Sequence, residues 1–236
     1  MWTRQELARR IDHTLLKPEA GESQVRVLVA EALRYNFASV CINPRWVKMA
    51  AGLLAAAGVG WETADEEKRT AVCACVGFPF GAVSTASKAF EAKECLGDGA
   101  GEIDMVIFLP ALLACDLDTA RADVRGVVEA ARTITKRIVV KVILETAMLT
   151  AEQIALGCRA ASEAGADFVK TSTGFHPAGG ASVEAVRLLK AHAPAMRVKA
   201  AGGIRDAATA RAMLEAGADR LGCSASVAIM DSWGGA

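Results

Sequence analysis

Short apolar runs alternate with longer amphipathic stretches from one end of the chain to the other. The runs are four to seven residues long and cover positions 11–16, 38–42, 71–76, 102–107, 138–144, 168–171, 198–201 and 220–223. Runs of this length, bounded by turn-forming or charged residues, are typical of buried strands. Between them apolar residues recur at helical spacing, as in 23–35. The pattern therefore predicts strands and helices in alternation.

Local signals mark where some helices begin. Thr3 with Glu6 three residues later forms a capping-box pattern, which predicts a short extra helix ahead of the first strand. Thr150 with Gln153 repeats this pattern before a later helix. The charged segment 64–69 is most simply a solvated turn.

Eight strand-helix units indicate an α/β fold. Apolar strands alternating with amphipathic helices form parallel sheets, and eight such units close most naturally as a (β/α)8 TIM barrel. A weak repeat supports this count, because a helix ends at glycine and leads into a strand at 99–103, 165–169 and 217–221. With 236 residues, 53% of them hydrophobic, the chain fits one domain spanning 1–236. An open doubly wound sheet is the alternative fold.

Two late strands each carry one lysine among apolar neighbours and then break into glycine. Lys170 follows Val169 and Lys199 follows Val198. If the valines pack outward against helices, alternation along the strand turns both lysines into the barrel. The ordinary alternative is a pair of exposed strand lysines.

Two inward lysines on neighbouring strands would be reactive. At roughly 5 Å and an effective dielectric near ~20, two ammonium groups repel by about 3 kcal/mol, which corresponds to roughly two pK units. Burial also disfavours the charged amine. We therefore expect the two lysines to lower each other's pKa and to leave an amine that can form a Schiff base with a carbonyl carbon.

Three further charged residues share the inward parity. Asp12 in the first strand, Asp104 in the fourth and Lys141 in the fifth would face the same interior. A carboxylate between lysines can orient them and pass a proton, which makes these residues catalytic candidates. A satisfied structural ion pair is the alternative for each carboxylate.

Glycine-rich turns after the late strands suggest an anion site. Backbone N–H groups in such turns cradle phosphate, and the loops after strands seven and eight are the usual place for it in these barrels. Glycine is also the ordinary residue of such turns, and a buried Cys41 would more simply be an inert thiol. The candidates for substrate and phosphate binding are Thr171, Gly174, Gly202, Gly203, Arg205, Gly222, Ser224 and Cys41.

Composition limits the kinds of partner that the protein can be expected to bind. Lys and Arg total 27 and Asp and Glu total 27, so no basic footprint suggests nucleic acid, and a small molecule is expected. The seven cysteines have neither CxxC pairs nor zinc-ligand spacing, which indicates reduced thiols in the cytoplasm and no metal. No cofactor is expected. The chain has no apolar signal segment or membrane-spanning run, so no membrane partner is expected.

The motifs together resemble those of deoxyribose-phosphate aldolases over nearly the whole chain. They are IDHTLL at 11–16, VCINP at 40–44, VGFP at 76–79, EIDMV at 102–106, KVILET at 141–146, FVKTSTG at 168–174 and VKAAGGIR at 198–205. The last two are the most specific.

The resemblance implies a reaction and a role for several residues. Lys170 would form the Schiff base with acetaldehyde, and Lys199 would lower its pKa. Asp104 would transfer protons with a water molecule, and Asp12 would support the lysines. The implied reaction is reversible cleavage of 2-deoxy-D-ribose 5-phosphate into glyceraldehyde 3-phosphate and acetaldehyde, without a metal. We allow for a homo-oligomer.

Three segments depart from the family pattern. The sequence GCSA at 222–225 replaces a usual serine pair, with Ser226 displaced by one position. FHPA at 175–178 replaces a small hydroxylic stretch, and FLP at 108–110 replaces Asn-Ile-Gly. These departures concern phosphate affinity and the range of acceptors. A phosphate-binding isomerase and a catalytically silent phosphate-binding barrel are the alternative functions.

Overall fold

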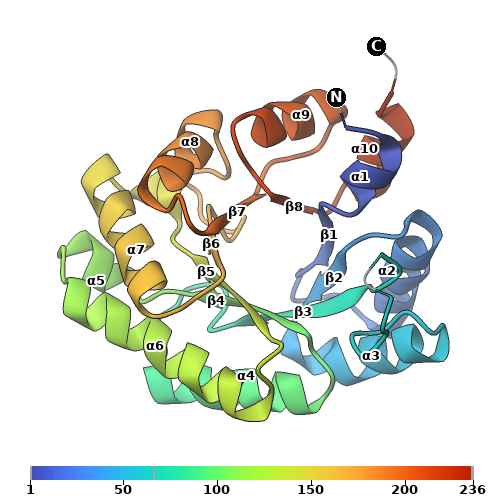
Figure 1. Ribbon diagram of the computed structural model, residues 1–236, viewed down its shortest axis with the longest axis horizontal. Coiled ribbons are helices and arrows are strands. Elements are labelled where there is room, and N and C mark those ends of the chain that lie inside the picture. Colours follow the sequence, from blue (N-terminus) through green and yellow to red (C-terminus); the bar gives the residue numbers. More distant parts are fainter. Residues whose placement is uncertain (1, 66, 235–236) are drawn as a thin grey trace.

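Eight parallel strands close into one barrel (Figure 1). The computed structural model describes residues 2–65 and 67–234, and β8 pairs with β1 to close the sheet. The strands are β1 (Ile11–Leu15), β2 (Ser39–Ile42), β3 (Ala71–Val76), β4 (Glu102–Val106), β5 (Val139–Ile143), β6 (Phe168–Lys170), β7 (Arg197–Ala201) and β8 (Arg220–Cys223). The predicted TIM barrel is confirmed, and the open sheet is excluded.

Helices surround the barrel and connect its strands. They are α1 (Arg4–Ala8), α2 (Glu22–Tyr35), α3 (Val47–Ala56), α4 (Thr85–Gly97), α5 (Leu109–Leu113), α6 (Leu117–Ile134), α7 (Ala151–Glu163), α8 (Val183–His192), α9 (Ala207–Glu215) and α10 (Ser226–Ser232), with 3-10 turns η1 (Pro44–Trp46) and η2 (Thr146–Met148). None of the described helices is long and apolar enough to cross a membrane.

One connection differs from the predicted single helix. Both α5 and α6 lie between β4 and β5. Cys115 has a left-handed backbone with φ of 54°, which ends the first helix, and the Asp116 carboxylate accepts the N–H of Thr119 to begin the second.

Both predicted capping boxes are present. At the start of α1 the Thr3 hydroxyl accepts the N–H of Glu6, and the Glu6 carboxylate accepts the N–H of Thr3 at 2.7 Å. Thr150 and Gln153 make the same exchange at the start of α7. These bonds satisfy donors that a helix start leaves unpaired. In the charged segment, residues 67 and 68 form the expected turn, and position 66 lies outside the described residues.

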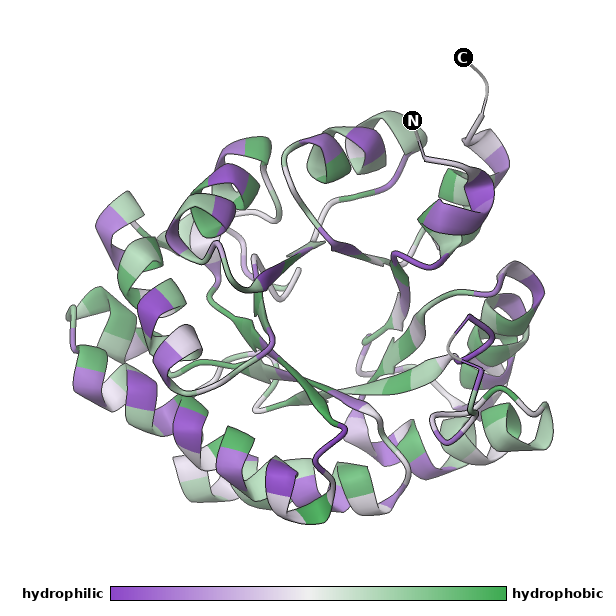
Figure 2. Cartoon of the chain, viewed as in Figure 1, coloured by the Kyte–Doolittle hydropathy of each residue, from purple (hydrophilic) through white to green (hydrophobic). Residues whose placement is uncertain are grey.

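The strands have two chemically different faces. Val140, Val142 and Val169 point outward and are fully buried against the surrounding helices. Lys141, which alternates with the first two, is equally buried and points into the barrel. In Figure 2 the strands are largely green, with purple residues interspersed among the green ones. Apolar burial between strands and helices therefore stabilises the fold, while the barrel interior carries charge.

We predict that Val142→Ala lowers the free energy of unfolding by about 2 kcal/mol, because truncation leaves a cavity between β5 and the helices. The measurement is the urea midpoint followed by circular dichroism. Val27→Ala is the matched control, since Val27 on α2 is 56% exposed and its truncation should change the midpoint little. Equal shifts for the two variants would contradict the assignment of the outward face of β5 to the core.

Candidate active site

Lys170 and Lys199 converge on one carboxylate oxygen. They are register partners on the neighbouring strands β6 and β7, as the sequence predicts. The Lys170 Nζ lies 2.7 Å from Asp104 Oδ2, and the Lys199 Nζ lies 2.6 Å from the same oxygen. All three side chains are buried. The alternative of exposed strand lysines is therefore wrong.

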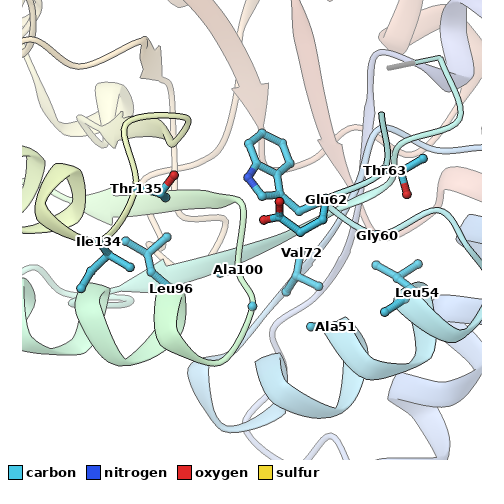
Figure 3. A pocket seen from close by; sticks show the side chains of 13 residues that line it. Ala51, Leu54, Gly60, Glu62, Thr63, Val72, Leu96, Ala100, Ile134 and Thr135 are labelled. Atoms are coloured by element: carbon cyan, nitrogen blue, oxygen red, sulfur yellow. The ribbon is translucent and has the colours of Figure 1, made fainter. Parts of the chain in front are cut away.

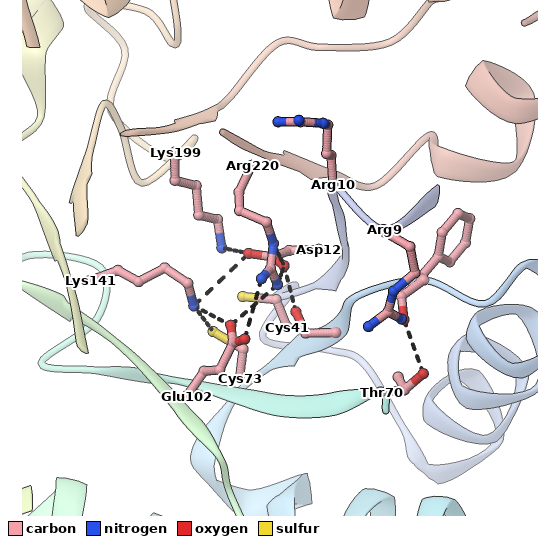
Figure 4. A network of polar contacts seen from close by, with 12 residues as sticks. Arg9, Arg10, Asp12, Cys41, Thr70, Cys73, Glu102, Lys141, Lys199 and Arg220 are labelled. Carbon is pink, nitrogen blue, oxygen red and sulfur yellow. Dashed lines mark hydrogen bonds and ion pairs between the residues drawn. The ribbon is translucent and has the colours of Figure 1, made fainter. Parts of the chain in front are cut away.

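Asp12 and Lys141 join the same cluster, as their parity predicts (Figure 4). The Lys199 Nζ lies 2.6 Å from Asp12 Oδ2. The Lys141 Nζ lies 2.9 Å from Asp104 Oδ1. Five residues from five different strands thus meet in the barrel interior.

Glu102 and Arg220 complete the cluster, and the sequence reasoning missed both as site residues. Glu102 on β4 lies 2.5 Å from the Lys141 Nζ. The Arg220 guanidinium on β8 contacts the carboxylates of both Asp12 and Glu102. The missed signal is the alternation rule itself, since Glu102 shares the parity of Asp104 and Arg220 that of Gly222.

The carboxylate of Asp104 reverses the expected shift at Lys170. Burial lowers the pKa of Lys170, and Lys199 also lowers it as predicted, but the adjacent Asp104 carboxylate raises it above the usual value. The predicted lowered pKa is therefore wrong for this arrangement, because the sequence argument counted the second lysine and not the anion between the two. Burial would raise the pKa of Asp104, yet the three ammonium groups hold it well below its usual range.

Among the three lysines of the cluster, Lys170 gives up its proton most readily. The cluster holds four cations and three carboxylates, which are Lys141, Lys170, Lys199 and Arg220 with Asp12, Glu102 and Asp104. An unpaired charge is costly in a dry interior, so a neutral cluster is favoured. The pKa of Lys170 is raised above its usual value. The pKa values of Lys141 and Lys199 lie well above the usual value despite burial, because two or more carboxylates contact each of these two lysines. Lys170 is the most weakly held of the three.

A cavity of about 320 Å³ opens above Lys170 at the C-terminal ends of the strands. Lys141 and Lys199 do not line it, so Lys170 is the cluster amine that a substrate in this cavity would meet. The predicted binding residues that line the cavity are Gly174, Gly202, Gly203, Arg205, Gly222 and Ser224.

Two glycines of the cavity wall leave no room for a side chain. Gly202 has φ of 92°, and a Cβ there would lie 3.0 Å from the Cα of Gly180. At Gly222 an added Cβ would lie 2.9 Å from the Ala201 Cβ and 3.1 Å from the Lys199 Cε. The absence of a side chain at Gly222 therefore leaves room for the stem of Lys199.

Two predicted binding residues lie outside the cavity lining. The Thr171 hydroxyl donates to the Ala201 carbonyl and accepts the Ala201 N–H, so it joins β6 to β7. Cys41 is fully buried beneath the site, 3.7 Å from the sulfur of Cys75. Both side chains make their contacts inside the barrel wall, and a contact of either residue with substrate stays a prediction. The displaced Ser226 is also buried, and its hydroxyl donates to the Cys223 carbonyl.

Several residues of the cavity were not predicted. Lys17 follows β1 and adds a further cation to the cavity lining, and Phe175 packs edge-on against Phe78 at 5.2 Å. Thr173 donates its hydroxyl to the Glu145 carboxylate at 2.5 Å, which anchors the loop after β6. A lysine directly after a strand was the available signal for Lys17.

A second hollow of about 560 Å³ lies elsewhere in the fold (Figure 3). Leu54, Trp61, Val72 and Leu96 line it, and Glu62 is its one carboxylate. None of the predicted site residues lines this hollow, whereas seven of them line the smaller cavity above Lys170.

Cys41, Cys73 and Asp104 place three donor atoms within 4.8 Å of one another. The Lys141 ammonium lies 3.3 Å from the Cys73 sulfur and 2.9 Å from Asp104 Oδ1. A positive charge thus already faces this donor group, and a cation would have to compete with it.

Comparison with known proteins decides the family. The sequence profile described as "DeoC/LacD family aldolase" matches residues 7–230. The chain belongs to this family of aldolases. Deoxyribose-phosphate aldolase 1 of Bacillus licheniformis is 48% identical over 226 residues, which cover 95% of each chain. Deoxyribose-phosphate aldolase of Exiguobacterium sp. is 50% identical over 226 residues, covering 95% of this chain and 96% of its own.

A solved structure supports the assignment of this chain to the aldolase family. The tetrameric deoxyribose phosphate aldolase from Aeropyrum pernix superimposes with a TM-score of 0.87 and 35% identity, covering 99% of this chain and 93% of its own. The resemblance noted in the sequence is confirmed at the level of the family.

We predict that iodoacetamide labels the folded aldolase only at Cys115. This residue is exposed and the other six cysteines are buried, and burial raises the pKa of Cys158 to about 12. Intact mass and peptide mapping check the number and position of the labels. Cys115→Ser should abolish labelling. Modification of Cys41 in the native protein would show that this thiol is accessible and would contradict the prediction.

Proposed function

We propose that this aldolase reversibly cleaves 2-deoxy-D-ribose 5-phosphate into glyceraldehyde 3-phosphate and acetaldehyde through a Schiff base on Lys170. The observation that carries the proposal is that Lys170 lines the cavity while the other two lysines of its cluster do not. The names of the relatives from Bacillus licheniformis and Exiguobacterium sp. support the choice of substrate.

The first step requires a neutral amine at Lys170. Loss of its proton leaves three cations facing three carboxylates, so the cluster becomes neutral. The amine then adds to the aldehyde carbon, and loss of water gives the imine. Asp104 Oδ2 accepts hydrogen bonds from both Lys170 and Lys199, which places it to hold the Lys170 amine in position while a water molecule carries the proton away and later returns it.

The imine then serves as the electron sink for carbon–carbon cleavage. A base removes the proton of the C3 hydroxyl, the C2–C3 bond breaks, and its electron pair forms an enamine with the imine carbon. Glyceraldehyde 3-phosphate leaves with the new C3 carbonyl. Protonation of the enamine carbon and hydrolysis of the resulting imine release acetaldehyde and restore the Lys170 amine. These steps use side chains of this chain and water only.

The glycine turns after β6 and β7 would hold the phosphate. Gly174, Gly202 and Gly203 line the cavity on the side where Arg205 adds a positive charge. Ser224 supplies one hydroxyl, while the buried Ser226 does not line the cavity. Lys17 offers a further cation to the same cavity.

We also propose that residues 1–236 act as one domain and that the aldolase works in the cytoplasm as a homo-oligomer. The tetrameric relative from Aeropyrum pernix supports assembly. Sedimentation of the purified chain would measure its state.

Borohydride reduction tests the covalent step. We expect reduction in the presence of acetaldehyde to add one two-carbon group to the Lys170 peptide, detected by mass spectrometry. Lys170→Met should remove both adduct and activity, whereas Lys93→Met on the exposed surface of α4 should retain both. Turnover without an adduct would favour the isomerase, and neither turnover nor adduct would favour the silent phosphate-binding barrel.

The pH dependence of imine formation tests Lys199. Lys199 lowers the pKa of Lys170, so Lys199→Leu should raise the pH of half-maximal imine formation by about one unit or more. The sign follows because loss of the neighbouring cation lets Asp104 hold the Lys170 proton to higher pH. Trapping with borohydride across a pH series measures the shift. An unchanged profile in a folded variant would remove Lys199 from its tuning role.

A further inference from the structure

Six arginines surround the N-terminal mouth of the barrel, at the end opposite the catalytic cavity. Two adjoining cavities of about 370 and 650 Å³ share Arg9, Arg197 and Arg220 in their walls. The arginines of the combined mouth are Arg9, Arg10, Arg69, Arg137, Arg197 and Arg220, and its carboxylates are Glu6, Glu67, Glu102 and Asp219.

The topology gathers these arginines from distant parts of the sequence. Each lies just before a strand or at its first residue: Arg10 precedes β1, Arg197 begins β7 and Arg220 begins β8. In a parallel barrel all strands start at the same end, so these side chains meet at one mouth. In Figure 4 the Arg220 side chain reaches into the cluster, and Arg9 and Arg10 lie outside it.

The carboxylates of the mouth are largely committed elsewhere. Glu6 caps α1 by accepting the N–H of Thr3. Glu102 lies 2.5 Å from the ammonium of Lys141 inside the barrel. Asp219 accepts the N–H of Val198 at 2.8 Å. These contacts draw negative charge away from the opening and leave the arginine charge dominant there.

Among the described residues neither Arg10 nor Arg197 forms an ion pair with a carboxylate, although Glu6 is close enough to Arg10 for an electrostatic interaction. The Arg197 guanidinium stacks on the Phe168 ring with its central carbon 4.1 Å from the ring centroid. Arg10 donates to the neutral backbone carbonyl of Asp219 at 3.4 Å. The positive charge of Arg220 also acts on Arg9. Burial lowers the pKa of Arg9, and the neighbouring Arg220 lowers it further.

We propose that this arginine-lined mouth binds a small polyvalent phosphate. Guanidinium groups match phosphate oxygens in bidentate geometry and remain charged at any physiological pH. The ligand would lie between Arg10 and Arg197, in a cavity large enough for a diphosphate group with or without a nucleoside.

Arg220 connects the site to the lysine cluster. Arg220 lines both cavities of the mouth and contacts Asp12, which lies 2.6 Å from the Lys199 Nζ. An anion beside Arg220 adds negative potential to the lysine cluster and favours the ammonium forms. Ligand binding should therefore raise the pH of half-maximal imine formation by roughly half to one unit.

Calorimetric titration with inorganic pyrophosphate tests binding directly and needs no turnover. We expect saturable binding that weakens at least tenfold in the double variant Arg10→Gln, Arg197→Gln. Arg187→Gln, an exposed arginine on α8, is the matched control and should bind as the parent does. The two single variants, each checked by thermal midpoint, keep the test valid if the double variant does not fold.

A second set of variants separates this site from the catalytic cavity. Arg205→Gln should leave pyrophosphate binding at the mouth intact, and loss of all binding in that variant alone would overturn the proposal. No saturable binding by the parent would overturn it as well. ADP binding equal to that of pyrophosphate would assign recognition to the phosphates, and tighter ADP binding would add a nucleoside contact. The change in the pH of half-maximal imine formation measures the coupling between the mouth and Lys170. This readout needs no cleavage of substrate, so it is separate from the test of the proposed reaction.

Discussion

The Asp104 carboxylate is the interaction on which the interior of this barrel depends. It receives Lys170 and Lys199 on one oxygen and Lys141 on the other. Removing three cations from water without such a partner would be prohibitively costly. One carboxylate therefore both makes the lysines tolerable in the core and determines how readily each gives up its proton.

The cost of this interior is offset by the layer outside it. The outward side chains of the strands are buried against the helices, and valines such as Val140, Val142 and Val198 are fully inaccessible. Because alternation separates the two faces, the apolar layer can stabilise the fold without competing with the charged one. The same separation lets the C-terminal loops shape a substrate cavity on a rigid support.

Ion pairs extend from the catalytic cavity to the opposite mouth of the barrel. Lys170 contacts Asp104, Lys199 joins Asp104 to Asp12, and Arg220 joins Asp12 to the N-terminal opening. Charges so close together in a medium of low dielectric respond to one another, so the proton affinity of Lys170 belongs to the whole chain of contacts.

The sequence by itself determined the eight alternating units, the capping boxes of α1 and α7, and the inward direction of both lysines, because these follow from local periodicity and hydrogen bonding. Only the tertiary structure decided the sign of the pKa shift at Lys170, the participation of Glu102 and Arg220, and the structural use of Thr171 and Cys41. Each depends on distances between strands far apart in the chain, and alternation gives a side chain's direction but not the neighbours that it meets.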